Sequence, residues 1–238
     1  MSRRNKLEKF AELLTFKNVY QNYSFKDPSI HYLGGELVER KGRWAQTHFK
    51  NDHPIVLELA CGWGEYTLEL ARQVPDQNFM GVDVKGNRIW KGAKSALDQA
   101  LDNVAFLRTR IEQIEHFFEK GEVSEIWITF PDPFLRKSKS NRRLTAAHFL
   151  RKYQQILPEA GIVHLKTDSP ELYDFTLETL QDVTFCEAVY SDEDIYGKSK
   201  VLPHPALEIQ TKYERMHLEA GKTIKYVRIR MSKTWIQS

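Results

Sequence analysis

The chain lacks the features that mark several special classes of protein. Its 238 residues include only two cysteines, Cys61 and Cys186, and neither lies in a CxxC pair or at metal-ligand spacing from a histidine. No uninterrupted apolar run reaches the roughly 18 residues of a membrane-spanning helix. We therefore expect no disulfide framework, no bound metal and no membrane partner.

The first residues and the overall charge exclude further classes. The opening sequence MSRRNK leads into mixed charged residues and not into the apolar run of a signal peptide, so we expect a cytoplasmic protein. Apolar residues make up 41% and charged residues 28%, which excludes disordered, collagen-like and coiled-coil chains. The net charge is only +3. An interaction with nucleic acid must therefore be argued from where the charges lie.

Apolar, β-rich runs alternate with helical patterns along most of the chain. The patterns predict strands at residues 54–60, 79–84, 104–108, 125–130 and 161–166, and helices at 65–73, 88–101, 111–119, 145–156 and 171–180. Such alternation builds parallel sheets with right-handed crossovers. Two later strands, 184–190 and 224–231, are separated by a helix at 206–220 and suit an antiparallel edge. We thus predict an α/β, doubly wound, mostly parallel seven-stranded sheet with an antiparallel edge strand.

Residues 1–50 differ from the rest of the chain. They are aromatic, basic and poorly periodic. We expect them to form a helical or irregular N-terminal arm, and residues 51–238 to form the main domain.

A glycine turn follows the first predicted strand of that domain. The segment VLELACGWGE, residues 56–65, contains Gly62 and Gly64, and Asp83 ends the next strand 19 residues after Gly64. Glycines at this place let a ligand approach the backbone, and an acidic side chain at the second strand can accept both hydroxyls of a ribose. A glycine pair alone is also typical of a tight turn. Thr67 stands where the dinucleotide fingerprint requires a third glycine, which disfavours a nicotinamide cofactor.

Glu58 lies inside the strand that leads into this turn. A carboxylate there would repel a pyrophosphate but attract a cation, such as the sulfonium and ammonium groups of S-adenosylmethionine (AdoMet). The alternative is a strand residue that meets solvent.

The segment EIWITFPDPF, residues 125–134, ends a predicted strand in a stiff turn. Two prolines restrict the backbone on either side of Asp132, so one carboxylate is presented at the carboxyl edge of the sheet. A helix cap or an ordinary turn residue is the alternative interpretation of Asp132.

Positive charge is concentrated directly after this turn. Residues 133–158 contain seven Lys or Arg and no acidic residue, although the whole chain is nearly balanced. This segregation is typical of an anion-binding surface more than of a solvated helix face. The residues expected to grip phosphates are Arg136, Lys137, Lys139, Arg142 and Arg143.

Two further polar segments follow later strands. HLKTD, residues 164–168, ends the fifth strand at the edge where ligands bind in such sheets. TKYE, residues 211–214, precedes the basic last strand and would by itself suit a solvated helix face. The histidines lie without ligand spacing, and no GxSxG elbow or Walker loop is present.

From about residue 30 to residue 230, the sequence resembles the bacterial tRNA (guanine-N7-)-methyltransferase family. The motifs that carry the resemblance are ELACGWG at 58–64, GVDV at 81–84, FPDPF at 130–134 with its basic tail, KTD at 166–168 and TKYE at 211–214. It implies a Rossmann-like class I methyltransferase that modifies guanine 46 in the variable loop of tRNA. AdoMet is the implied cofactor and tRNA the implied partner.

The resemblance also implies site residues. Glu58, Gly62, Gly64, Asp83 and Asp132 fall at cofactor-binding positions, and Asp132 is also the implied catalytic residue. The implied substrate-binding residues are Arg136, Asp168, Thr211, Lys212, Tyr213 and Glu214.

Four positions depart from the family pattern. Arg110 stands where the family usually has an Asp that contacts the adenine end of the cofactor. Asp83 replaces a commoner Glu, Arg136 a common Lys and Phe134 a frequent Trp.

Two other functions stay open at this point. An AdoMet-dependent amino-group methyltransferase would carry Asn/Asp-Pro-Pro-Tyr after the same strand, where this chain has Phe-Pro-Asp-Pro-Phe. A catalytically inactive RNA-binding module on the same fold is the other alternative, because Arg110 departs from the pattern. Measured AdoMet affinity separates the inactive module from both enzymes.

Overall fold

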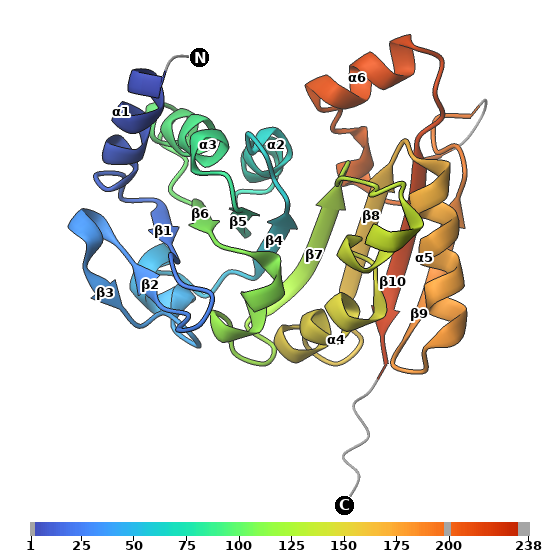
Figure 1. Ribbon diagram of the computed structural model, residues 1–238, viewed down its shortest axis with the longest axis horizontal. Coiled ribbons are helices and arrows are strands. Elements are labelled where there is room, and N and C mark those ends of the chain that lie inside the picture. Colours follow the sequence, from blue (N-terminus) through green and yellow to red (C-terminus); the bar gives the residue numbers. More distant parts are fainter. Residues whose placement is uncertain (1–2, 198–200, 233–238) are drawn as a thin grey trace, which may run out of the picture.

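The computed structural model describes residues 3–197 and 201–232 (Figure 1). Within these residues, ten strands form one sheet in the order β3-β2-β1-β6-β5-β4-β7-β8-β10-β9. The strands are β1 (Val19–Gln21), β2 (Ile30–His31), β3 (Leu37–Val38), β4 (Ile55–Leu59), β5 (Asn78–Asp83), β6 (Val104–Arg108), β7 (Val123–Thr129), β8 (Ile162–Thr167), β9 (Cys186–Asp192) and β10 (Lys225–Met231).

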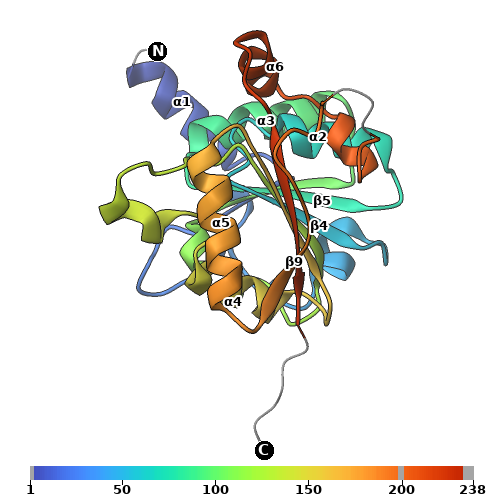
Figure 2. The ribbon, with the colours of Figure 1, turned by 90° about the vertical axis from the view of Figure 1, so that its right-hand side faces the viewer.

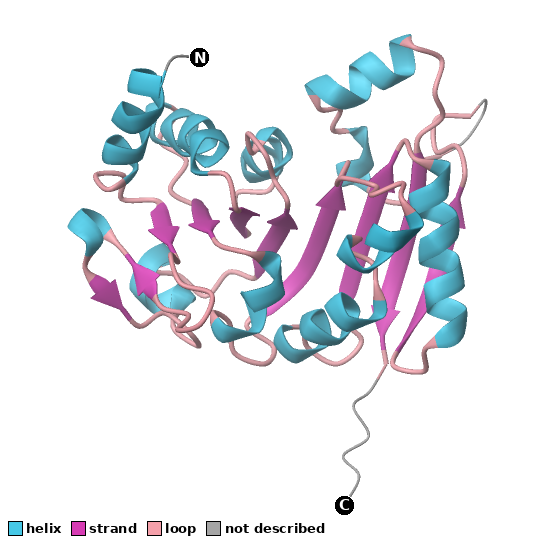
Figure 3. Ribbon diagram, in the orientation of Figure 1, coloured by secondary structure: helices cyan, strands magenta, loops and turns pink. Residues whose placement is uncertain are grey.

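Helices surround this sheet (Figure 3). The α-helices are α1 (Arg3–Leu13), α2 (Glu65–Gln73), α3 (Gly86–Asp98), α4 (Ala147–Ile156), α5 (Pro170–Asp182) and α6 (Lys212–Glu219). Short helical turns are η1 (Leu33–Gly35), η2 (Ala45–Phe49), η3 (Ile111–His116), η4 (Lys137–Arg142) and η5 (Pro205–Glu208).

All seven predicted strands are present, and the predicted doubly wound sheet is confirmed. Strands β6, β5, β4, β7 and β8 are parallel. Strand β10 pairs antiparallel with both β8 and β9, so the antiparallel strand lies one place in from the edge. Because the strands from β4 to β8 are parallel, their carboxyl ends meet along one edge, which lies at the top of β7 and β8 in Figure 1.

The N-terminal region extends this sheet, a feature that the sequence pattern did not predict. Strand β1 pairs in parallel with β6, Val19 lying opposite Phe106, and β2 and β3 continue the sheet outward. Strands of two or three residues are too short to show a period of two. The arm expected at residues 1–50 is therefore in part a continuation of the main sheet.

Two predicted helices differ from the structure. The first of them, at 111–119, is the shorter 3₁₀ helix η3. The segment predicted as one helix at 206–220 is divided into η5 and α6 by extended backbone at Ile209 and Thr211. The Thr211 side chain caps α6 by accepting a hydrogen bond from the Glu214 N–H, which starts a new helix at that point.

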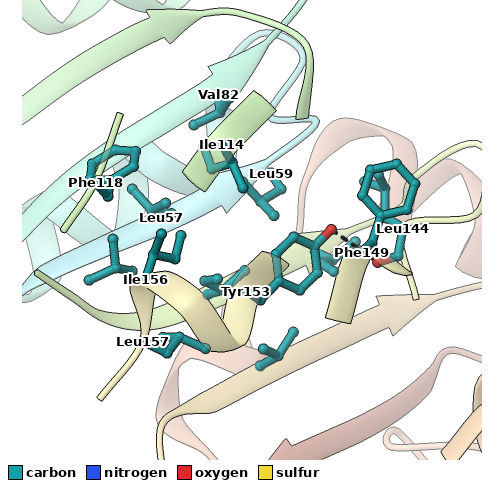
Figure 4. Close-up of a cluster of buried hydrophobic side chains, with 14 of the residues drawn as sticks. Leu57, Leu59, Val82, Ile114, Phe118, Leu144, Phe149, Tyr153, Ile156 and Leu157 are labelled. Carbon is teal, nitrogen blue, oxygen red and sulfur yellow. Dashed lines mark hydrogen bonds between the residues drawn. The ribbon is translucent and has the colours of Figure 1, made fainter. Parts of the chain in front are cut away.

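The core has two halves, one on each face of the sheet, because side chains alternate along a strand. Leu57 and Leu59 of β4 pack toward α4 and α5, whereas Val56 packs toward α2 and α3. In the side view of Figure 2, α4 and α5 lie on one side of the strands and α2 on the other. Figure 4 shows the α4 half, where the Tyr153 hydroxyl donates to the Leu144 carbonyl at 3.0 Å. Glu58 therefore points to the α2 face.

Both cysteines are buried and unpaired. Over residues 3–197 and 201–232, no helix combines the length and the apolar character needed to cross a bilayer.

Candidate active site

The turn between β4 and α2 has an unusual backbone. Ala60, Gly62 and Gly64 all have positive φ, at 58°, 58° and 69°. A Cβ added to Gly62 would meet no atom within 4 Å, so this position is open to a ligand. A Cβ on Gly64 would lie 2.7 Å from the Phe106 ring. Gly62 thus leaves room at the sheet edge, while Gly64 is required for packing of the turn against β6.

Asp83 ends β5 beside this turn and is only 5% exposed. Its Oδ2 accepts from the Gly62 N–H at 3.0 Å and its Oδ1 from the Lys85 N–H at 2.7 Å. A carboxylate has about four acceptor sites, so both oxygens can accept further hydrogen bonds. The backbone contacts hold the carboxylate beside the β4 turn, and its remaining acceptor sites can accept from a ligand with two neighbouring hydroxyls.

Glu58 is 4% exposed, and both of its oxygens are engaged. Oε2 accepts from the backbone N–H, at 2.9 Å, and the hydroxyl of Thr67, and Oε1 accepts from the Thr129 hydroxyl at 2.7 Å. Thr67 is the residue that replaces the third glycine of the dinucleotide fingerprint, and the structure shows its role as a partner of Glu58. Burial raises the pKa of Glu58 to about 7, against the lowering effect of these hydrogen bonds.

A cavity at the carboxyl edge brings residues of three motifs together, although neither Asp83 nor Asp132 is among its lining residues. It is lined by Glu58, Gly62 and Trp63 at the β4 turn, by Thr129 and Phe130 at the end of β7, and by Thr211 and Tyr213 at the start of α6. Arg88 of α3 also lines it, and nothing in the sequence pattern singled out this residue. A guanidinium beside a cavity with a buried carboxylate suits a zwitterionic ligand, such as an amino acid group.

The FPDPF turn is strained at both ends. Phe130 and Phe134 have φ values of 47° and 42°, a region that non-glycine residues rarely adopt. Asp132 lies between them with an exposed side chain, and its Oδ1 accepts from the Phe134 N–H at 3.0 Å. The rigid backbone therefore presents the carboxylate outward at the end of β7.

Four of the five residues of the predicted basic surface are exposed. Arg136, Lys137, Lys139 and Arg142 are exposed on η4 and its cap, in the yellow-green segment that projects at the left of Figure 2. Arg143 is different, since it is 7% exposed and donates to the carbonyls of Pro133 and Phe134 at 2.9 and 3.2 Å. Its expected role as a phosphate contact is therefore wrong in this structure, and it braces the FPDPF turn.

Of the expected substrate residues at the ends of β8 and α6, four are accessible to different degrees. Lys212 and Tyr213 are exposed, and the Tyr213 ring lies 6.0 Å from the Trp63 ring. Thr211 lines the cavity. The Asp168 carboxylate accepts from Lys222 Nζ at 2.6 Å, so a neighbouring cation already balances its charge.

Glu214 is placed differently from the other expected substrate residues. Its side chain is fully buried and forms an ion pair with the equally buried Lys166 at 2.7 Å. Lys166 Nζ also donates to the Leu207 and Ile209 carbonyls at 3.0 and 2.9 Å. A direct contact between the Glu214 side chain and substrate is therefore wrong for this structure. The pair instead fixes the segment that carries Thr211 and Tyr213 over the cavity.

Two histidines without ligand spacing in the sequence are brought together by the fold. Nε2 of His164 lies 3.2 Å from Glu125 Oε1, and His204 lies beside both residues. His204 Nδ1 accepts from the Ala206 N–H at 3.1 Å, so its Nε2 carries the proton of the neutral ring and is a donor. In this tautomer the Nε2–H of His204 can donate to an acceptor such as the nearby Glu125 carboxylate, while Nδ1 holds the start of η5 through the Ala206 N–H. That no metal is bound stays a prediction.

The pKa of Glu58 predicts how cofactor affinity depends on pH. With a pKa of about 7, raised by burial, Glu58 is partly protonated in the free protein near neutrality. A cationic ligand favours the ionised form, so below pH 7 binding must release a proton. The affinity for AdoMet should then fall by up to about tenfold for each pH unit below 7.

Calorimetric titration with AdoMet from pH 5.5 to 7.5 measures this effect. The range ends there because an α-amino group itself titrates near about 7.7–8.0. Glu58→Gln is the control, and its affinity should vary less with pH than that of the wild type. Parallel pH profiles for the two proteins would contradict the assignment to Glu58.

Comparison with known proteins identifies the family. A family model described as "Putative methyltransferase" matches residues 52–227. The tRNA (guanine-N(7)-)-methyltransferase of Christiangramia forsetii is 50% identical over 97% of this chain and 100% of its own length. The enzyme of the same name from Bacteroides thetaiotaomicron is 44% identical over 96% of this chain and 86% of its own.

Solved structures agree on the fold. The 16S rRNA methyltransferase KamB has a TM-score of 0.59 at 16% identity and covers 84% of this chain and 98% of its own. A variant 16S rRNA (adenine(1408)-N(1))-methyltransferase from Catenulisporales acidiphilia, solved with its cosubstrate SAM, has a TM-score of 0.59 at 15% identity, over 86% of this chain and 97% of its own. The sheet is thus that of a Rossmann-like class I methyltransferase. On its sequence similarity to these relatives, the chain belongs to the tRNA (guanine-N(7)-)-methyltransferase family.

Proposed function

We propose that this protein transfers the methyl group of AdoMet to N7 of guanine in tRNA, at position 46 of the variable loop. The observation that carries the proposal is the common edge of the sheet. There the β4 turn, whose Gly62 N–H donates to Asp83, shares a cavity with Phe130 of the turn that presents Asp132, and a basic segment follows that turn. The 50% identity to a relative named for this reaction supports it.

The residues present fit AdoMet. Asp83 would accept the two ribose hydroxyls, and the open space at Gly62 would admit the cofactor beside the backbone. Glu58 and Arg88 face the same cavity and match an ammonium and a carboxylate group. When bound, AdoMet supplies an electrophilic methyl group on a positively charged sulfur.

The chemistry at guanine N7 requires positioning more than proton transfer. N7 carries an in-plane lone pair and no proton, so no general base is needed to expose the nucleophile. Alignment of two reactants can contribute about 7–11 kcal/mol to lowering a barrier. Asp132 would accept hydrogen bonds from guanine N1–H and the exocyclic amine, which fixes the base while the carboxylate stabilises the cationic methylated ring.

Binding of the tRNA body falls to charged residues around this turn. A stacked guanine must first leave its stack, at a cost of a few kcal/mol. Phosphate contacts from Arg136 and its exposed basic neighbours would offset that cost. Asp168 and Thr211 to Tyr213 are the proposed contacts nearer the base. We place the reaction in the cytoplasm, because two buried, unpaired cysteines suit a reducing compartment.

Removing the basic side chains should change the salt dependence of tRNA binding. In the quadruple alanine variant of Arg136, Lys137, Lys139 and Arg142, each lost phosphate contact should reduce the slope of log affinity against log salt by roughly 0.7–0.9. Filter binding between about 50 and 200 mM salt measures it. The control is a quadruple alanine variant of cations elsewhere on the surface, at Lys41, Lys50, Lys94 and Lys120. Equal slopes in the two variants would place the RNA surface elsewhere.

Methylation of bulk tRNA in vitro tests the function itself. The purified protein, AdoMet and tRNA that lacks the modification should produce 7-methylguanosine after digestion to nucleosides. A methylated exocyclic amine would support the amino-group methyltransferase. AdoMet binding without any methylated nucleoside would reject the proposed substrate, and no AdoMet binding would support the inactive RNA-binding module.

A further inference from the structure

His204 caps the short helix η5, which leads into the segment that carries Thr211 and Tyr213. Its Nδ1 accepts a hydrogen bond from the Ala206 N–H at 3.1 Å. The Ala206 carbonyl accepts from the Tyr66 hydroxyl of α2 at 2.6 Å. The start of η5 is therefore tied to the histidine through one backbone group and to α2 through the other.

The position of η5 determines the position of the residues that follow it. The carbonyls of Leu207 and Ile209 accept from the buried Lys166 ammonium at 3.0 and 2.9 Å, and Lys166 also pairs with Glu214 of α6. Thr211, between these contacts, lines the cavity at the carboxyl edge and caps α6. A displacement of η5 would therefore displace the start of α6 as well.

Only the neutral His204 ring can accept from Ala206. A protonated imidazole carries a hydrogen on both nitrogens, so Nδ1 would then be a donor that faces the Ala206 N–H. Burial lowers the pKa of His204, and so do the neighbouring His164 of β8 and Arg228 of β10. The Glu125 carboxylate of β7 acts in the opposite direction without reversing the shift. The folded protein therefore favours the neutral ring.

We propose that His204 is a positioning residue for tRNA contact, which in its neutral form holds η5 and residues 209–214 beside the cavity and on protonation releases them. The inference rests on the proposed function, because Thr211 and Tyr213 are proposed substrate contacts. A histidine whose pKa is lowered by folding destabilises the folded arrangement as the pH falls below its ordinary value of about 6.5. The docking equilibrium of the segment should therefore fall by up to about tenfold between pH 6.5 and pH 5.5.

Amide hydrogen exchange of residues 204–214 tests the capping role without substrate. The quantity compared is the protection factor, the intrinsic exchange rate at each pH divided by the measured rate. In the wild type it should be constant from pH 7.5 to 6.5 and then fall severalfold, and by at most about tenfold, at pH 5.5. His204→Asn supplies a capping oxygen that does not titrate, so its protection should not change with pH. His204→Ala removes the cap and should lower protection about fivefold at pH 7.5.

His53→Asn is the matched control, because it makes the same substitution at an exposed histidine before β4. It should keep the pH dependence of the wild type. Glu58, with a pKa of about 7, and His164, whose pKa burial lowers, are present in every variant. The difference between His204→Asn and His53→Asn therefore isolates His204, and equal pH profiles for these two variants would overturn the inference.

Methylation kinetics test the connection to tRNA. Between pH 7.5 and pH 5.5, with saturating AdoMet, the KM of the wild type for tRNA should rise by up to about tenfold more than that of His204→Asn, while the two kcat values change in parallel. Parallel KM values would make His204 a structural cap and overturn its role toward tRNA. If exchange behaves as expected but no tRNA is methylated at any pH, the proposed function fails and the role toward tRNA fails with it, whereas the capping by His204 stands.

Discussion

Asp132→Asn is expected to slow methyl transfer by about 10²-fold or more. The asparagine keeps the shape of the side chain, and its Oδ1 can still accept from the Phe134 N–H, so the turn between the two prolines should persist. The change removes the negative charge and directs an amide donor toward the donors of guanine. Loss of one preorganised polar contact costs about 10²–10³ in rate at other active sites. Binding of the tRNA body should change little, since phosphate contacts supply most of that affinity.

Single-turnover methylation with saturating tRNA and AdoMet isolates the chemical step. The affinities for tRNA and for AdoMet are measured separately, because Asp132 is also an expected cofactor contact. The matched control is Asp76→Asn, which makes the same change at an exposed position between α2 and β5. A rate near that of the control would leave Asp132 as a residue of a rigid turn with no part in catalysis. A slow rate with both affinities intact would support the catalytic role.

The central part of the fold follows from local sequence patterns. The predicted helix at 65–73 has the same bounds as α2, and the strand predicted at 104–108 coincides with β6. Both are amphipathic or uniformly buried segments of ordinary length, for which periodicity is informative. The three N-terminal strands escaped prediction because they are only two or three residues long, and because β1, which joins them to the main sheet, pairs with β6 more than eighty positions away along the chain. Pairing over that distance leaves no local pattern.

The candidate site likewise contains some residues that could be predicted from the sequence and others that could not. Asp83 and Gly62 could be placed from the chain, because residues that follow parallel strands meet at one edge. The braces behind them could not. Arg143 looked like one more cation in a basic run until the fold buried it against the FPDPF turn. Arg88 lines the cavity although no motif contains it.

Lys166 and Glu214 are the clearest example of such a brace, and their separation should be severely destabilising. Lys166→Met leaves Glu214 fully buried without its cation. Among the described side chains, only the Tyr196 hydroxyl, at 2.7 Å, still donates a hydrogen bond to the Glu214 carboxylate. Breaking a buried ion pair by removing one partner costs about 3–5 kcal/mol in the free energy of unfolding. For a chain of this size, that corresponds to a fall in Tm on the order of 10 °C. The Ile209 carbonyl also loses the Lys166 donor, and the Leu207 carbonyl loses one of two donors, the other being the Tyr196 hydroxyl at 2.8 Å.

The pH dependence of this loss distinguishes a buried charge from lost packing. Burial raises the pKa of Glu214, and the Lys166 ammonium opposes the rise. Without Lys166 the carboxyl of the folded protein takes up a proton more readily, and a raised pKa in the folded state adds stability as the pH falls. The deficit of Lys166→Met relative to wild type should therefore be smaller at pH 5 than at pH 8.

Urea denaturation of three variants measures these effects. The double variant Lys166→Met/Glu214→Gln removes the unpaired charge and should recover part of the stability that Lys166→Met loses. Lys94→Met makes the same substitution in an exposed pair with Asp98 and should cost less than about 1 kcal/mol. A loss of similar size in Lys94→Met and Lys166→Met would show that the buried pair contributes nothing special. A deficit in Lys166→Met that is equal at pH 5 and pH 8 would trace the instability to the lost carbonyl contacts and packing, and not to the stranded carboxylate of Glu214.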